Sequence, residues 1–167
     1  TACAALGVSP KEMTSDTGLD ALSLGGTKLG LLGAEAVLFF RPELARDFGY
    51  IRKQGMQLAS KMRFLAVQLE ALFQDDLWLE LARRANAMAR MLADELREIP
   101  GLELTREVQT NMVYAVIPPE AVKRIRRRYL FHVFDEKQSE ARLVTNYDTT
   151  EEDVRGFAEA AREALDQ

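Results

Sequence analysis

The spacing of apolar residues divides the chain into stretches of different kinds. Two short apolar runs, Ala21–Leu24 and Ala36–Phe40, predict strands, and the second is apolar enough to be buried. Apolar residues then recur every three or four positions, which predicts one helix from about Tyr50 to Phe73 and a second from about Leu77 to Ile99. The pair at 100–101, Pro-Gly, ends the second helix.

Cap and turn residues mark the ends of further elements. Gly7 stops a short helix over Thr1–Leu6, and Ser9 caps another that begins at Pro10. Thr150 and Asp153 form a capping-box-like pair at the start of the last helix. Between these ends lie strand patterns at 102–104, 112–117, 130–134 and 142–145, and a helical pattern at 119–127. Long helices followed by such a small mixed unit predict two subdomains, with the hinge in the second long helix.

Composition and charge narrow the functional classes. The 167 residues carry a net charge of -4 with a pI near 5.2, which gives no field that attracts nucleic acid. The basic run 123–128 is short and precedes a strand pattern, so we interpret it as a solvated helix end. The single Cys3 excludes an internal disulfide and fits a reducing compartment. No apolar run reaches the roughly 20 residues of a membrane span, so we expect a cytoplasmic protein without membrane partners.

The glycine-rich stretch between the first two strands carries one lysine, Lys28. Gly25 and Gly26 precede it, and Gly30 and Gly33 follow it. A nucleoside-triphosphate phosphate loop is rejected, because that motif needs glycine before the lysine, Ser or Thr after it, and then a helix. Composition alone leaves two interpretations open: an exposed turn lysine, or a lysine that forms a Schiff base with an aldehyde.

The Schiff-base interpretation has a physical basis. An amine that attacks an aldehyde must be neutral part of the time, which requires a desolvated pocket of fixed shape. Glycines such as Gly26 let the backbone approach a flat cofactor closely. The hydroxyl of Thr27 is placed to contact a phosphate or a cofactor ring. Flanking buried strands would hold the amine of Lys28 at a fixed position relative to the bound aldehyde.

Four segments resemble one known family. They are DALSLGGTKLGLLGAEAVLFF around Lys28, KQGMQLASKMRFLA from Lys53, TNMVYAVIP from Thr110, and ARLVTNYDTTEEDV from Ala141. Together they resemble the threonine aldolase and beta-eliminating lyase family, in particular low-specificity L-threonine and phenylserine aldolases. Leu29 departs from that pattern, since those enzymes carry asparagine there.

The resemblance implies an α/β fold of the aspartate-aminotransferase-like type, fold type I of the pyridoxal-phosphate enzymes. Residues 1–85 would then be the C-terminal part of the large cofactor-binding domain with a connecting helix, and residues 86–167 the small C-terminal α+β domain. The first residues resemble the segment that follows the family's DGAR motif. We therefore expect an N-terminal half upstream, which would hold the ring-stacking histidine, the aspartate facing the pyridine nitrogen, and the phosphate loop.

The resemblance also implies roles for individual residues. Lys28 would carry pyridoxal 5'-phosphate, with Gly26 and Thr27 lining the cofactor. Arg142, in the family's RLVT motif, would hold the substrate carboxylate, because a guanidinium makes two parallel bonds to a carboxylate. Lys61 would reach the cofactor phosphate, with the dimer interface as one route, although a solvated helix face fits Lys61 equally well. The lone His132 matches no family motif and is expected to be structural or partly exposed.

The implied activity is cleavage of β-hydroxy-α-amino acids, such as threonine, allo-threonine or phenylserine, to glycine and an aldehyde. A small-molecule amino acid would be the substrate, and a homodimer or homotetramer the assembly. Two alternatives stay open. The same scaffold could perform β-elimination or racemisation, and Leu29 could mark a degenerate, non-catalytic scaffold. Asn111 is interpreted as a structural residue that satisfies backbone groups at a strand start.

Overall fold

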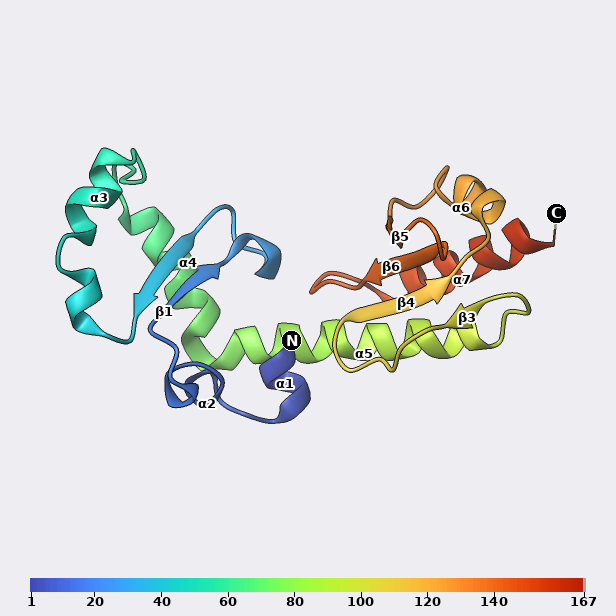
Figure 1. Ribbon diagram of the computed structural model, residues 1–167, viewed down its shortest axis with the longest axis horizontal. Helices are drawn as coiled ribbons and strands as arrows, with labels where there is room; N and C mark the ends of the chain where they lie inside the picture. The colour runs from blue at the N-terminus through green and yellow to red at the C-terminus, as the bar shows by residue number, and fades with distance from the viewer. Residues whose placement is uncertain (167) are drawn as a thin grey trace. The chain divides into compact units, whose positions relative to one another are not determined.

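The computed structural model describes residues 1–166, which fall into two compact units (Figure 1). One unit, here called the hairpin unit, comprises Leu6–Glu80. The other, the sheet unit, comprises Thr1–Ala5 together with the chain from Leu81 onward. The boundary lies inside the longest helix, α5 (Leu77–Arg97). No helix among residues 1–166 is long and apolar enough to cross a membrane.

The hairpin unit is made of short elements around a two-stranded ladder. In chain order they are α1 (Ala2–Leu6, which begins in the sheet unit), α2 (Pro10–Met13), η1 (Ser15–Thr17), β1 (Ala21–Gly25), η2 (Thr27–Leu29), β2 (Glu35–Phe39), η3 (Pro42–Ala45), α3 (Phe48–Gln54), α4 (Arg63–Phe73) and η4 (Gln74–Asp76). The predicted stop at Gly7 is confirmed by its left-handed φ of 68°. The predicted cap is confirmed too, since Ser9 and Glu12 form a full capping box.

Strands β1 and β2 form an antiparallel hairpin that pairs Ala21 with Phe39 at one end and Gly25 with Glu35 at the other. Both strands were predicted, and their existence is confirmed. The expectation that the second is buried is wrong for the described residues: Val37 and Leu38 are 43% and 40% exposed. The physical reason is that β2 packs mainly against β1 and the short η3 turn, so among residues 1–166 no helix layer covers both of its faces.

The single helix predicted from about Tyr50 to Phe73 is wrong, because two helices occupy that stretch. Helix α3 ends at Gln54, where the Gly55 N–H bonds the Ile51 carbonyl at 2.8 Å. Met56 and Lys61 then adopt positive φ values of 55° and 59°, which a right-handed helix cannot contain. Helix α4 begins only at Arg63.

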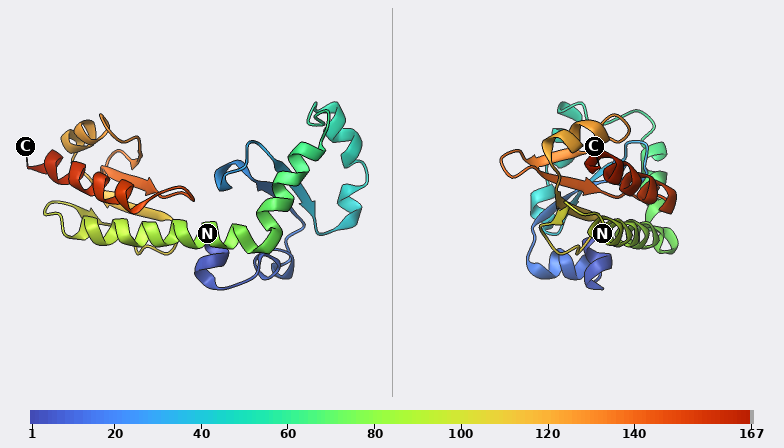
Figure 2. Two further views of the ribbon diagram at one scale, coloured as in Figure 1. Left: turned by 180° about the vertical axis from the view of Figure 1, so that it is seen from behind. Right: turned by 90° about the vertical axis from the view of Figure 1, so that its right-hand side faces the viewer.

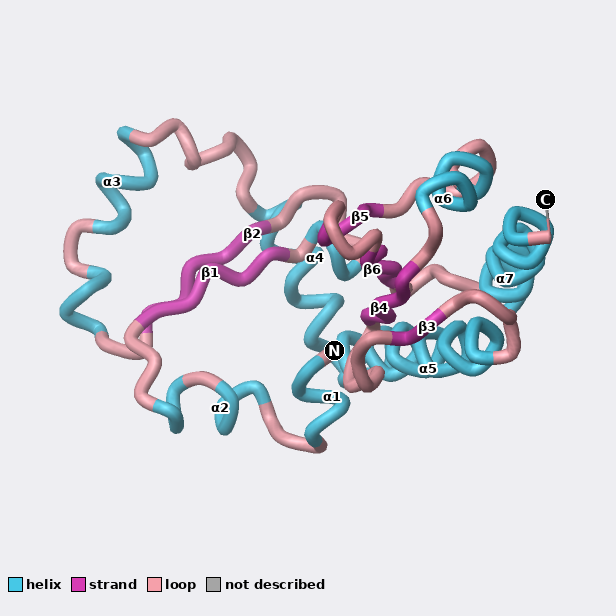
Figure 3. Tube along the Cα trace, turned by 45° about the vertical axis from the view of Figure 1, so that its right-hand side comes forward, coloured by secondary structure: helices cyan, strands magenta, loops and turns pink. Residues whose placement is uncertain are grey.

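The sheet unit contains an antiparallel sheet of four strands in the order β3-β4-β6-β5, shown with the β1–β2 hairpin in Figure 3. Its strands are β3 (Glu103–Leu104), β4 (Met112–Val116), β5 (His132–Asp135) and β6 (Glu140–Val144). The predicted strands are confirmed, with β5 starting two residues later than the pattern indicated. Leu130, the expected first residue, is 96% exposed.

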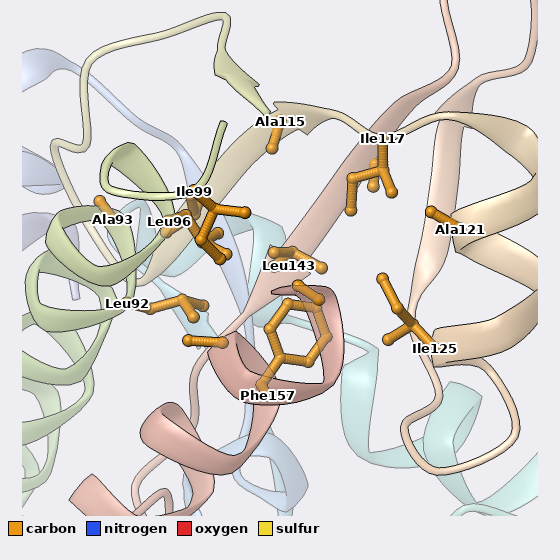
Figure 4. Close-up of a cluster of buried hydrophobic side chains, with 14 of the residues drawn as sticks. Leu92, Ala93, Leu96, Ile99, Ala115, Ile117, Ala121, Ile125, Leu143 and Phe157 are labelled. Atoms are coloured by element: carbon orange, nitrogen blue, oxygen red, sulfur yellow. The ribbon is translucent and has the colours of Figure 1, made fainter. Parts of the chain in front are cut away.

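Helices α5, α6 (Pro119–Ile125) and α7 (Glu151–Leu165) bury one face of this sheet (Figure 2). Leu96 of α5, Leu143 of β6 and Phe157 of α7 converge in the core with Ile117 and Ile125 (Figure 4). Because strand side chains alternate, the residues between the core positions point to the opposite face of the sheet. That outer face carries the candidate arginine, Arg142.

Candidate active site

The turn between β1 and β2 positions Lys28. The Gly26 N–H bonds the Ala34 carbonyl at 2.9 Å, and the Gly26 carbonyl accepts from the N–H groups of Leu29 and Leu31 at 2.9 and 3.2 Å. Lys28 therefore lies in the middle of a short 3-10 turn, η2, whose start and end are tied to one glycine. Gly30 ends the turn with a left-handed φ of 95°.

Gly26 has no room for a side chain. A Cβ at this position would lie 2.4 Å from Leu31 Cδ1 and 2.6 Å from the Ala34 carbonyl oxygen. The second contact is with backbone, so rotation of a side chain does not relieve it. Glycine at 26 is therefore required by the close approach of two backbone segments, which also fixes where the Lys28 turn starts.

The rest of the loop is anchored to helix α4. The Leu32 N–H bonds Gln68 Oε1 at 2.8 Å, and Gln68 Nε2 bonds the Phe64 carbonyl at 2.8 Å. Lys28 itself is exposed, and its amine forms no hydrogen bond or ion pair with any residue in 1–166. The desolvated pocket expected around Lys28 is therefore not supplied by the described residues.

Thr27 has a partner that the sequence did not predict. Its hydroxyl donates to Glu35 Oε1 at 3.4 Å, across the end of the hairpin. Glu35 reaches this position because it pairs with Gly25, which has no side chain to exclude it. Thr27 keeps its lone pairs as acceptors, while its proton is directed to a carboxylate.

Lys61 lies beside a helix, in the loop just ahead of α4. It is exposed, adopts φ of 59°, and lies two residues before the first residue of α4. Neither a hydrogen bond nor an ion pair joins Lys61 to the Gly26–Lys28 turn among residues 1–166. The turn thus brings Gly26, Thr27 and Lys28 together without Lys61.

Arg142 lies at the centre of the outer face of the four-stranded sheet. Across the ladders it pairs with Tyr114 on β4 and with His132 on β5. Its side chain is half-buried, and its Nε is buried without a hydrogen-bond partner. No residue in 1–166 accepts a hydrogen bond from its guanidinium. An unbonded, partly desolvated guanidinium is suited to bind a carboxylate.

Four further residues form a connected cluster on the Arg142 side of the sheet, and sequence reasoning did not find them. The Arg142 guanidinium carbon lies 6.0 Å from the Phe134 ring centre, and that of Arg106 lies 4.0 Å from the Tyr114 ring centre and 5.3 Å from that of Phe134. Arg106 also pairs with Glu140, at 2.8 Å. The period-2 alternation of 112–116 places Tyr114 opposite the core-facing residues. That alternation was the available signal.

Two other residues behave as expected. The Asn111 side chain bonds the Thr145 carbonyl at 2.8 Å, which confirms its structural role at the start of β4. His132 is exposed on β5. Within residues 1–166, no group of three or more His, Cys, Asp or Glu side chains is arranged to hold a metal ion.

The hairpin turn and Arg142 belong to different units. The hairpin unit carries an exposed lysine on a turn bounded by glycines, and the sheet unit carries an arginine that has no partner among residues 1–166. Comparison with known proteins then gives the family. The beta-eliminating lyase family model matches residues 1–118. The chain belongs to this family, as the resemblance of its motifs indicated.

The relatives are threonine aldolases. The chain is 43% identical, over 162 residues, to the low specificity L-threonine aldolase of Pseudomonas aeruginosa, and 41% identical over 165 residues to the enzyme of the same name from Pseudomonas sp. strain NCIMB 10558. The matches cover 96% and 98% of this chain but 46% and 47% of those relatives. The chain therefore spans about half the length of the curated relatives it matches.

Solved structures show the same fold. A Leishmania major threonine aldolase structure aligns with a TM-score of 0.77 at 24% identity, covering 88% of this chain and 44% of that one. A glycine decarboxylase (P-protein) of the glycine cleavage system aligns with a TM-score of 0.54 at 21% identity, covering 87% and 35%. The expected fold, α/β of fold type I, is confirmed by the first of these neighbours.

Proposed function

We propose that this chain supplies the cofactor-binding lysine and the carboxylate-binding arginine of a pyridoxal-phosphate-dependent aldolase. The substrates would be β-hydroxy-α-amino acids such as threonine, allo-threonine or phenylserine, and the products glycine and an aldehyde. The observation that carries the proposal is the 43% identity, over nearly the whole chain, to a protein named low specificity L-threonine aldolase. Because the match spans about half of that relative, we propose the activity for this chain combined with the remaining segment.

The residues of the hairpin turn fit the cofactor. Gly26 anchors the turn that presents Lys28, and the amine of Lys28 is not engaged by another residue in 1–166. Lys28 would hold the cofactor covalently through its amine nitrogen, with Gly26 and Thr27 beside it. Bound pyridoxal phosphate supplies an electron sink for the charge that is left on the α-carbon when a bond to it breaks. We keep Lys61 as a proposed phosphate contact, since its ammonium is exposed.

Arg142 would bind and orient the amino acid. Two parallel N–H···O bonds fix the plane of the carboxylate, and this fixes which bond of the α-carbon is held for cleavage. The half-buried position of Arg142 supports this role, because a charge-assisted bond is stronger where water is partly excluded. We assign the base that takes the β-hydroxyl proton to a residue outside this chain.

One alternative has an observation in its favour. The family model that matches residues 1–118 is described as beta-eliminating lyase, so elimination on the same scaffold is the second candidate. No such observation supports racemisation. None supports a non-catalytic scaffold either, the alternative that the departure at Leu29 had left open. For the assembly we propose a homodimer or homotetramer, which sedimentation of the chimera would test. For the location we propose the cytoplasm.

The test is a chimera in which this chain replaces the segment of the Pseudomonas aeruginosa aldolase that it matches. We expect the chimera, loaded with pyridoxal phosphate, to release glycine and acetaldehyde from threonine. Borohydride reduction followed by peptide mass spectrometry should place the cofactor on Lys28. Release of pyruvate from serine without glycine would favour elimination, and a cofactor tag on Lys53 or Lys61 would contradict the assignment of Lys28. Lys28→Ala is the inactive control.

A further inference from the structure

Glu140 and Arg142 are two residues apart on β6, and their side chains point to the same face of the sheet. The residues on either side of Arg142, Ala141 and Leu143, are buried in the core at 0% and 4% exposure. Because strand side chains alternate, Glu140 and Arg142 both lie on the outer face. Neighbours of this kind, about 7 Å apart along a strand, are within reach of long side chains. Glu140 is thus a natural partner for Arg142, and pairing would neutralise the arginine.

The structure shows a different pairing. Glu140 is 5% exposed and accepts hydrogen bonds from the hydroxyl of Thr105 and from Arg106, the latter at 2.8 Å. Both donors come from the segment between β3 and β4. A buried carboxylate needs such partners, since an unpaired buried charge is strongly unfavourable. Arg142 meanwhile has no ionic partner among residues 1–166.

The position of Arg106 is fixed by aromatic rings. Its guanidinium carbon lies 4.0 Å from the ring centre of Tyr114, which is the cross-strand neighbour of Arg142. The same carbon lies 5.3 Å from the ring centre of Phe134, and the two rings contact each other edge-on at 5.6 Å. Cation–π contacts of this kind add to the ion pair with Glu140 in holding the guanidinium in place.

We propose that Arg106 is a positioning residue that engages Glu140 and so keeps Arg142 free to bind an external carboxylate. The identity of that carboxylate as the substrate's rests on the proposed function. The engagement of Glu140 by Arg106 does not, and this makes the two claims separable by experiment. In the absence of Arg106, Glu140 is expected to turn to Arg142, which lies two positions along the same face of β6.

The experiment follows the Nε–Hε signal of Arg142 by nitrogen-15 NMR in the chimera described above, with acetate as the probe. The signal is assigned by its loss in Arg142→Lys. In the unsubstituted chimera the signal should shift on titration with acetate. Arg106→Ala should move the signal before acetate is added, and should raise the acetate dissociation constant roughly two- to fivefold, the strength of a competing surface ion pair. Arg106→Ala/Glu140→Gln should restore both the shift and the affinity.

Controls separate this effect from loss of structure. Arg128→Ala removes another arginine–glutamate pair of the same unit, with Glu163 at 3.1 Å, and should leave the Arg142 signal unchanged. If Arg106→Ala does not fold, Arg106→Gln keeps one donor for Glu140 and should show a smaller change of the same sign. An Arg142 signal that is unmoved in the folded Arg106 variant overturns the proposal. So does a loss of acetate affinity that Glu140→Gln fails to restore.

One further outcome distinguishes the two claims. If the Arg142 signal of the unsubstituted chimera does not shift with acetate, but moves in Arg106→Ala and returns in the double variant, the engagement of Glu140 is supported. The carboxylate-binding role of Arg142 in the proposed function is then contradicted.

Discussion

Gly25 lies directly opposite Glu35 at the last pair of the β1–β2 ladder, where the chain enters the Lys28 turn. A Cβ on Gly25 would stand 3.0 Å from Glu35 Oε2. The missing side chain lets the Glu35 carboxylate lie over the strand end, where it accepts from the Thr27 hydroxyl. The glycines before Lys28 therefore do different things: Gly25 admits a carboxylate, and Gly26 admits the backbone of Ala34.

Gly26→Ala is expected to damage the Lys28 turn. The new methyl group would lie 2.6 Å from the Ala34 carbonyl oxygen, so the backbone must shift, at a cost of about 1–3 kcal/mol in the free energy of unfolding. In the chimera, we expect a lower urea midpoint and a smaller fraction of protein carrying the cofactor. Faster amide exchange at Leu29 and Leu31, both bonded to the Gly26 carbonyl, would locate the damage.

The matched control is Gly49→Ala. Gly49 lies in α3, and a Cβ there meets nothing within 4 Å. Because alanine has a higher helix propensity than glycine, the control substitution should be neutral or should stabilise the protein by up to about 1 kcal/mol. Equal urea midpoints for Gly26→Ala and the unsubstituted chimera would show that the turn does not need glycine at 26.

Arg142→Ala is expected to raise the KM of the chimera for threonine and to lower its kcat as well. Carboxylate binding and orientation of the scissile bond come from the same contact, so both constants change. Loss of a charge-assisted pair of bonds should cost about 2–4 kcal/mol, which is roughly a 30- to 1,000-fold fall in kcat/KM. Steady-state kinetics over a range of threonine concentrations measure the two constants separately.

Two comparison variants sharpen that result. Arg142→Lys keeps the charge but loses the paired donors, so its kcat/KM should lie between those of Arg142→Ala and the unsubstituted chimera. Arg128→Ala, on an exposed arginine paired with Glu163, should change neither constant. An unchanged kcat/KM in Arg142→Ala would remove the proposed carboxylate role.

Sequence reasoning located the elements of the sheet unit well because their signals are local. The Thr150–Asp153 capping box, the alternation around Val113 and the apolar stripe of α5 are each encoded within a few residues, and all are present in the structure. The break between α3 and α4 was missed because apolar spacing continues through it. Lys61 and Met56 leave the helical region of backbone space without any Pro nearby to announce it.

The residues around the candidate site were harder to predict because they meet only through register. Glu35 reaches Thr27 by the pairing of β1 with β2, and Arg106 reaches Glu140 across 34 positions of sequence. Nothing in the spacing of these residues specifies that pairing. The family motifs were sufficient to identify Lys28 and Arg142 in the sequence. The neighbours of these two residues could be identified only from the three-dimensional structure.

The two units should differ in stability when the 167-residue chain is studied alone. The hairpin unit buries two apolar side chains of its own, Ala34 and Leu72, while Tyr50, Met56 and Phe64 are 63% or more exposed. The sheet unit has a continuous core from α5 to α7. Because local stability follows buried apolar contact, hydrogen exchange should be slow at the core strands of the sheet unit and fast in the β1–β2 hairpin.

That measurement also bears on solubility. The exposed apolar positions of β2, Val37 and Leu38, lie on a strand with one free edge among the described residues, which favours association. We expect the chain alone to be poorly soluble or partly molten, and inactive toward threonine. A single sharp cooperative transition with equal protection in both units would contradict this expectation.

Acid should weaken the start of α7. The Thr150 hydroxyl donates to Asp153 Oδ2 at 2.6 Å and the Thr150 N–H donates to the same oxygen at 2.8 Å, and these bonds hold the pKa of Asp153 below its ordinary value of 3.8. A carboxyl whose pKa is depressed by folding contributes stability that is present above its unfolded pKa and lost as the pH falls through its folded pKa. The contribution of Asp153 should therefore be complete near neutral pH and disappear below pH 3.8.

The substitution Asp153→Asn isolates this contribution. At pH 6 the variant should melt at a lower temperature than the wild-type chain, because the amide accepts the two Thr150 hydrogen bonds more weakly than a carboxylate does. As the pH falls below 3.8, the wild-type chain loses its advantage and the two melting temperatures should converge. Glu152→Gln removes one negative charge from the same helical turn without touching the capping box, so it reports the general effect of charge near the helix start. Circular dichroism melts of the three proteins between pH 2.5 and pH 6, roughly one unit either side of the ordinary carboxyl range, give the comparison. A gap between wild type and Asp153→Asn that stays constant across this range would show that the Asp153 carboxylate contributes nothing through its charge.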